Sequence, residues 1–104
     1  MNWYSHLYTG RNAEKNRKKM IRRVEQKKML TNIYLITLAA NPENQLDIMP
    51  AGSLHFPYLE RSCPLIIGIA AGYEEALELV QTIVSEVYQQ TGDVRIRDYL
   101  ETGK

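Results

Sequence analysis

The sequence is poor in cysteine and in long apolar runs. Its 104 residues include one cysteine, Cys63, which can form no intrachain disulfide and cannot build a metal site by itself. The longest apolar runs, around Leu65–Ile69 and Leu35–Ala40, are far shorter than the ~18 residues that a membrane-spanning helix requires. Residues 1–5 also lack the basic segment followed by an apolar core that marks a secretion signal. We therefore expect a soluble, cytoplasmic protein.

Histidine is equally scarce. His6 and His55 are the only two, and neither has a companion ligand three or four residues further along the chain. Cys63 could act as a nucleophile only beside a base that the fold brings to it. The acids Glu43 and Asp47 lie in segments that read as turn or loop, where carboxylates are usually solvated. We expect no metal, no cofactor and no catalytic residues, and we favour a non-enzymatic protein.

The composition is that of one small globular domain. Hydrophobic residues make up 44% of the chain and charged residues 24%, close to the averages for folded proteins. A chain of 104 residues is within the usual size of a single domain and can bury one modest core. We therefore expect residues 1–104 to form a single domain.

Four segments carry the strongest periodic patterns. Asn32–Ala40 and Pro64–Ala71 are nearly continuous in apolar residues, which is typical of strands buried on both faces. Residues 12–29 and 73–90 repeat apolar side chains at helical spacing and predict two amphipathic helices. In the second helix the wheel places Leu77 on the apolar face and acids, among them Glu75, on the opposite face.

Weaker patterns predict the remaining elements. Trp3–Tyr8 is rich in strand-forming residues, and Asp93–Tyr99 alternates apolar and basic side chains as an edge strand does. Between the two halves, Leu46–Met49 is a candidate for a short edge strand and Ala51–His55 for a helical turn.

The element order predicts the fold class. Two βαβ units joined by an irregular link indicate an α/β fold, a ferredoxin-like two-layer sandwich with a four-stranded sheet. The alternative is a small three-layer sheet with helices on both faces. The ferredoxin-like topology places the first and third strands centrally, whereas the second and third have the most buried patterns here. In that topology the open sheet face would carry Tyr and Leu side chains, which favours a homodimer.

Charge is divided unevenly along the chain. Residues 1–30 carry nine basic and two acidic side chains, a net charge of +7, whereas residues 31–104 carry a net charge of −6. The basic helix could bind nucleic-acid phosphates, although it holds no aromatic residue for base stacking. Its charge could instead be solvated, or attracted to the acidic second helix if both pack on one side of the sheet. The candidate nucleic-acid-binding residues are Lys15, Lys18, Lys19, Arg22 and Arg23.

The two turns that lead from a strand into a helix are candidate anion sites. Free backbone N–H groups at a helix start can hold a phosphate or a carboxylate. The first and third strands run parallel in both topologies, so both turns lie at one edge of the sheet. Neither turn matches a phosphate-binding motif, and the acids beside the second would repel a phosphate. The candidate ligand-binding residues are Thr9, Gly10, Arg11, Asn41, Gly72 and Tyr73, with Arg17, which the wheel places within the apolar face.

Tyrosine is the one residue in excess, with seven in the chain. Tyrosine is favoured at protein interfaces, because its ring buries area and its hydroxyl still finds a partner. The proline-flanked residues Phe56, Tyr58 and Leu59 are candidates for an interface, and core or rim positions are the alternative.

The segments Tyr34–Asn44 and Gly68–Ala76 resemble a family of short, uncharacterised proteins from Firmicutes bacteria. The resemblance runs from Trp3 to Leu100 and implies a bacterial, cytoplasmic, stand-alone protein, without assigning an activity. Our leading hypothesis is a protein-interaction module that acts as a homodimer with an unidentified protein partner. Nucleic-acid binding by the basic helix, and anion or nucleotide binding at the turns, are the alternatives.

Overall fold

A four-stranded mixed sheet forms the centre of the computed structural model, which describes residues 2–28, 30–39, 45–93 and 95–101. The strands are β1 (Trp3–Thr9), β2 (Ile33–Leu38), β3 (Leu46–Pro50) and β4 (Ile66–Ala71), in the order β1-β4-β2-β3. β4 runs parallel to β1 and antiparallel to β2, and β2 runs antiparallel to β3. The predicted α/β class and four-stranded sheet are therefore confirmed.

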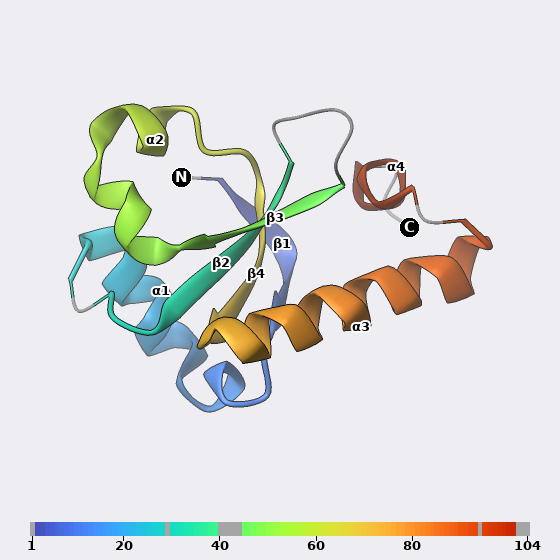
Figure 1. The fold of residues 1–104 in the computed structure, drawn as a ribbon, viewed down its shortest axis with the longest axis horizontal. Helices are drawn as coiled ribbons and strands as arrows, with labels where there is room; N and C mark the ends of the chain where they lie inside the picture. Colours follow the sequence, from blue (N-terminus) through green and yellow to red (C-terminus); the bar gives the residue numbers. More distant parts are fainter. Residues whose placement is uncertain (1, 29, 40–44, 94, 102–104) are drawn as a thin grey trace.

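The two central strands, β2 and β4, are the two segments with continuous apolar patterns. Adjacent residues of a strand point to opposite faces, so a strand covered on both sides needs apolar residues throughout. Leu35 packs into one core cluster, and its neighbour Ile36 packs into the other. Helices therefore cover both faces of the sheet, as in the three-layer alternative (Figure 1).

On one face lie the basic helix and the link between β3 and β4. The expected helix of residues 12–29 is a 3-10 turn, η1 (Ala13–Asn16), followed by the shorter α1 (Arg17–Gln26). The link contains the 3-10 turn η2 (Ala51–His55), as predicted, and a short helix, α2 (Pro57–Arg61), which was not. Buried side chains from these segments close this core: Ala13, Met20, Val24, Ala51 and Leu54.

On the other face lies α3 (Tyr73–Thr91), the helix predicted over 73–90, together with α4 (Ile96–Glu101). The buried apolar residues of α3 follow helical spacing: Ala76, Leu79, Ile83 and Val87. Leu77 was expected on this face but is 43% exposed. Within the described residues, no helix is both long enough and apolar enough to cross a membrane.

The prediction of an edge strand at Asp93–Tyr99 is wrong, because α4 begins within this segment, at Ile96. The alternation of apolar and basic residues in this segment fits the period of two that is typical of a strand. Ile96 and Leu100, however, are four residues apart, and both are buried on one face of a helix beside α3. The fourth strand is β3, the short edge strand expected at Leu46–Met49. The ferredoxin-like strand order is wrong too, since β2 and β4 are central.

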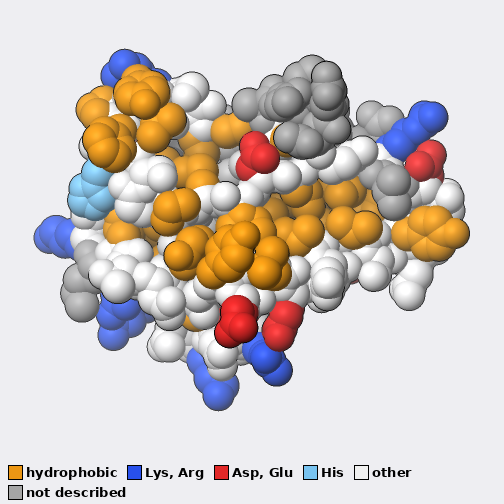
Figure 2. Space-filling model, in the orientation of Figure 1, with side chains coloured by type: hydrophobic (Ala, Val, Ile, Leu, Met, Phe, Trp, Pro, Cys, Tyr) orange, Lys and Arg blue, Asp and Glu red, His pale blue; other side chains and the backbone are white. Residues whose placement is uncertain are grey.

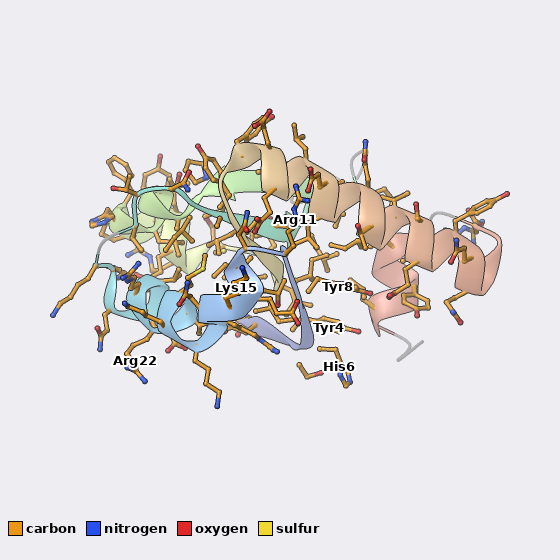
Figure 3. The ribbon with its side chains drawn as sticks, turned by 90° about the horizontal axis from the view of Figure 1, so that it is seen from below. Tyr4, His6, Tyr8, Arg11, Lys15 and Arg22 are labelled. Carbon is orange, nitrogen blue, oxygen red and sulfur yellow. The ribbon has the colours of Figure 1, made fainter. Side chains whose placement is uncertain are left out.

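Because helices cover both faces of the sheet, two further expectations are wrong: the contact between the basic and the acidic helix, and the open sheet face. α1 and α3 lie on opposite sides of the sheet, so the basic helix does not meet the acidic helix there. The open sheet face that favoured a homodimer is also absent, because α3 and α4 pack against it. Figure 3 shows α1 and α3 with the strands between them.

Candidate nucleic-acid interface

The two strand-to-helix turns lie side by side, as expected from parallel strands. The backbone N–H of Gly10, which follows β1, donates to the carbonyl of Ile69 in β4 at 2.9 Å. Thr9 and Ile69 are partners in the same ladder. Backbone N–H groups that have no backbone acceptor therefore converge where β1 and β4 end, which is the arrangement that binds anions in other α/β proteins.

Here the anion is supplied by the chain itself. One carboxylate oxygen of Glu75 accepts a hydrogen bond from the N–H of Asn12 at 3.0 Å. The other accepts from Ala71 at 2.9 Å and from Ala13 at 3.1 Å. The sequence placed Glu75 on the exposed face of its helix, and that prediction is wrong, since the residue is only 6% exposed.

The environment of Glu75 stabilises the ionised form. Burial alone would raise its pKa, but the three backbone N–H donors and the Asn12 side chain outweigh it and hold the pKa of Glu75 below its ordinary value. Gly10 is required by this contact, because a Cβ atom there would lie 2.1 Å from a Glu75 carboxylate oxygen. Gly72, just before α3, has φ of 108°, a conformation that favours glycine.

The remaining space at these turns is acidic. A hollow of ≈ 460 Å³ is lined by Arg11, Gly72 and Tyr73 but also by Glu74 and Glu78. Arg11 already forms an exposed ion pair with Glu78 at 3.2 Å. The structure thus brings most of the candidate ligand residues together around an internal carboxylate, with further acids beside it.

Two candidate ligand residues are not part of this cluster. Arg17 is exposed, because the preceding residues form a 3-10 turn and α1 begins only at Arg17, so the ideal wheel does not apply. Asn41 lies outside the described residues. The strand before it, β2, runs antiparallel to β4, so its last residue, Leu38, lies at the opposite end of the sheet from Gly72.

The basic side chains of η1 and α1 form an unpaired surface. Met20 and Val24 are the buried residues of α1, which directs the basic residues outward. Within the described part of the chain the ion pairs are Arg11–Glu78, Lys27–Glu60 and Arg95–Asp93. None of the five candidate residues takes part in them. We call these five the basic face: Lys15, Lys18, Lys19 and Arg22, which are exposed, and Arg23, which is half-buried.

An aromatic row on the edge strand β1 lies close by along the chain. Tyr4 and Tyr8 have nearly parallel rings with centroids 6.4 Å apart, and Tyr4 meets the exposed His6 edge-on at 5.9 Å. The Tyr8 hydroxyl donates a hydrogen bond to the Glu86 carboxylate, and burial together with that carboxylate raises the pKa of Tyr8. Tyr4 and Tyr8 pack against the core cluster of α3 and α4, so the row lies on the opposite face of the sheet from α1. Figure 3 labels the three residues of the row and Lys15.

This row was missed from the sequence, although the signal was present. Tyr4, His6 and Tyr8 alternate with Ser5 and Leu7, so they share one side of a strand. The absence of aromatic residues from the basic helix had counted against nucleic-acid binding. The fold supplies them from the preceding strand instead.

Other candidate residues lie elsewhere. Phe56 and Tyr58 are 58% and 62% exposed, and Leu59 is half-buried. Figure 2 shows hydrophobic side chains gathered on the surface over α2. Cys63 is partly buried, and burial raises the pKa of its thiol, so it is a weak nucleophile at neutral pH. The part of the chain that the structure describes holds no cluster of three or more potential metal ligands.

Replacing Glu75 should destabilise the fold. Glu75→Ala leaves three backbone N–H groups without their acceptor, and we expect a loss of about 3 kcal/mol or more in the free energy of unfolding. Urea denaturation at neutral pH measures it. The matched control is Glu74→Ala at the exposed neighbouring position, expected to cost less than about 1 kcal/mol. Equal losses in the two variants would contradict the role of Glu75.

The same carboxylate predicts a dependence of stability on pH. Because the pKa of Glu75 is lowered in the folded state, its contribution is complete above the ordinary pKa of about 4.3 and disappears as pH falls through the folded pKa. Urea midpoints between neutral and acidic pH should fall more steeply for the wild type than for Glu75→Gln. Glu60→Gln is the control, since that half-buried carboxyl also has a lowered pKa, through its hydrogen bond with Lys27. Identical slopes for wild type and Glu75→Gln would show that Glu75 does not set this dependence.

Comparison of the chain with protein-family models, with curated proteins and with solved structures finds no match. The resemblance to short Firmicutes proteins therefore stays a prediction. The interpretation of the surface rests on two features of the chain itself, the basic face and the aromatic row.

Proposed function

We propose that the protein binds single-stranded nucleic acid across the basic face and the aromatic row of β1. The observations that carry the proposal are the unpaired cations of the basic face and the aromatic side chains of the edge strand β1. α1 lies on one face of the sheet, whereas Tyr4 and Tyr8 pack on the other, so the bound strand would pass over the edge of the sheet that β1 forms. Proteins that bind single strands use this combination, in which cations follow the phosphates and aromatic rings stack on the bases.

The cations supply a sequence-independent attraction. Each phosphate neutralised by Lys or Arg releases condensed counterions, so the affinity falls as salt rises. None of the five residues of the basic face forms an ion pair with a carboxylate within the described residues. A cationic surface can bind phosphates only if carboxylates of the same chain do not neutralise it, and the basic face meets this condition within the described residues.

The aromatic row favours single strands over duplexes. The bases of a duplex are stacked on one another, whereas those of a single strand are free to stack on protein rings. His6 is exposed and lies edge-on to Tyr4, and the hydrogen bond from Tyr8 to Glu86 fixes the other end of the row. The row thus presents the exposed ring of His6, which its contact with Tyr4 helps to hold in place.

Charge reversal on the basic face should weaken binding. Lys15→Glu combined with Arg22→Glu should lower the affinity for a labelled oligonucleotide by about tenfold or more. It should also reduce the slope of log K against log salt by at least about 1.4, as expected for two phosphate contacts on a single strand. Fluorescence anisotropy at several salt concentrations measures both quantities.

The control for charge reversal reverses the same number of cations outside the basic face. Arg61→Glu combined with Arg95→Glu alters exposed cations outside the basic face, in α2 and just before α4. This variant should keep most of the affinity and the full salt slope. Equal weakening by both double variants would mean that net charge, and not this surface, governs binding.

Removing the exposed ring of the aromatic row should affect single strands selectively. His6→Ala should weaken single-strand binding by about fivefold or more, since stacking contributes about 1–3 kcal/mol per base, and should leave duplex binding nearly unchanged. His55→Ala, at the other exposed histidine, is the matched control. If the two histidine variants bind alike, the aromatic row plays no part in binding.

A further inference from the structure

A second hollow, of ≈ 290 Å³, lies between α1 and the turn that precedes β2. Its volume is close to the lower end of the range for ligand pockets, about 300–1,000 Å³. The polar residues that line it come from three segments of the chain: Asn12, Asn16, Lys19, Arg23, Thr31 and Asn32. Buried apolar side chains of α1 and β2 form its floor.

The chemistry of this hollow is opposite to that of its neighbour. The hollow at the strand-to-helix turns contains three carboxylates, whereas this one contains none and offers two cations, three amides and a hydroxyl. Asn12, Asn32 and Ala71 line both, so the two hollows adjoin. An anion is therefore excluded from the first hollow and favoured in the second.

Three donors of this hollow have no partners among the described residues, whereas the side chain of Asn12 hydrogen-bonds Glu75. No hydrogen bond or ion pair of the described chain involves the side chains of Lys19, Arg23 or Thr31. Lys19 and Arg23 are four residues apart on α1, a spacing at which like charges repel. Arg23 is half-buried, which removes part of the water that would otherwise screen its charge. An anion held between the two would relieve both costs.

We propose that this hollow binds a phosphate monoester group. The guanidinium of Arg23 can donate two parallel hydrogen bonds to phosphate oxygens, and the ammonium of Lys19 adds a point charge. The amides and the hydroxyl supply neutral donors around the remaining oxygens. The inference rests on the proposed function, because the hollow shares Lys19 and Arg23 with the basic face and so receives the terminal phosphate of a bound strand. A free mononucleotide carries the same group and is the second source that the experiment must separate.

The experiment compares strands that differ only at their ends. Fluorescence anisotropy is measured for an oligonucleotide of about a dozen residues with hydroxyl ends, with a 5′-phosphate and with a 3′-phosphate. A hydroxyl-ended strand two nucleotides longer serves as the control for added negative charge. Isothermal titration calorimetry with adenosine monophosphate and with adenosine tests the hollow without any strand.

Two pairs of substitutions locate the effect. Lys19→Gln combined with Arg23→Gln removes both cations of the hollow, and Lys15→Gln combined with Lys18→Gln removes two cations of the basic face outside it. Asn16→Asp, at an exposed position on the rim, is a milder variant that places a carboxylate beside the phosphate without truncating α1. Circular dichroism confirms that each variant is folded.

We expect one phosphorylated strand to bind about tenfold more tightly than both hydroxyl-ended strands, as two charge-assisted hydrogen bonds allow. This ratio should fall to about one in Lys19→Gln/Arg23→Gln and in Asn16→Asp. It should persist in Lys15→Gln/Lys18→Gln, although that variant binds every strand more weakly.

The failures of the two proposals are distinguishable. If all strands bind equally well and adenosine monophosphate binds no better than adenosine, the phosphate site is wrong while strand binding stands. If adenosine monophosphate binds and no strand does, the hollow takes a small phosphate ester and the proposed function is wrong. A preference for phosphorylated strands that survives in Lys19→Gln/Arg23→Gln would overturn the assignment of the site.

Discussion

The carboxylate of Glu75 is the contact on which the arrangement of this domain depends. It accepts backbone hydrogen bonds from the end of β4 and from both residues that open η1, and it belongs to the first turn of α3. A single buried anion thus ties together the parallel pair β1 and β4 and the helices that follow each strand. Without it the same N–H groups would be buried and unpaired, a state that folded proteins rarely tolerate. The side chain of Glu75 also fills the space that a Cβ at Gly10 would need, which restricts that turn to glycine.

An internal anion changes what this edge of the sheet can do. In many α/β proteins the carboxyl ends of parallel strands receive a ligand's phosphate. Here Glu75 takes that position, and Glu74 and Glu78 make the adjoining hollow acidic. The cations lie on α1, on the other face of the sheet, where they form no ion pair within the described residues. The near-neutral net charge of +1 therefore hides two surfaces of opposite sign. The two surfaces meet where Asn12, Asn32 and Ala71 line both hollows, and each would attract groups of the opposite charge.

The parts of the fold that follow from local pattern could be predicted from the sequence. The buried strands β2 and β4 and the long helix α3 were recognisable, because each has a sustained apolar period. α4 was not, since its apolar residues also fit a short alternation, and only packing beside α3 decides between the two. Arg17 was misplaced because an ideal helical wheel cannot anticipate a 3-10 turn at the start of a helix. The basic face was visible as a run of charges, whereas the role of Glu75 depends on N–H groups 62 and 63 residues away in the chain, which no local pattern encodes.

The edge strand β1 has features that oppose pairing with a second copy of the chain. An open strand edge is a template for pairing with another chain, and proteins protect such edges with bulges and nearby charge. β1 has both, since its register with β4 shifts between Trp3 and Tyr8, and the chain continues directly into the basic face. Two copies pairing through β1 would bring two basic faces together, which the repulsion of like charges opposes. A polyanion meets no such repulsion, because its phosphates are attracted to the cations that hold a second copy away. The features that oppose pairing through this edge are therefore the same ones on which the proposed binding of a polyanion depends.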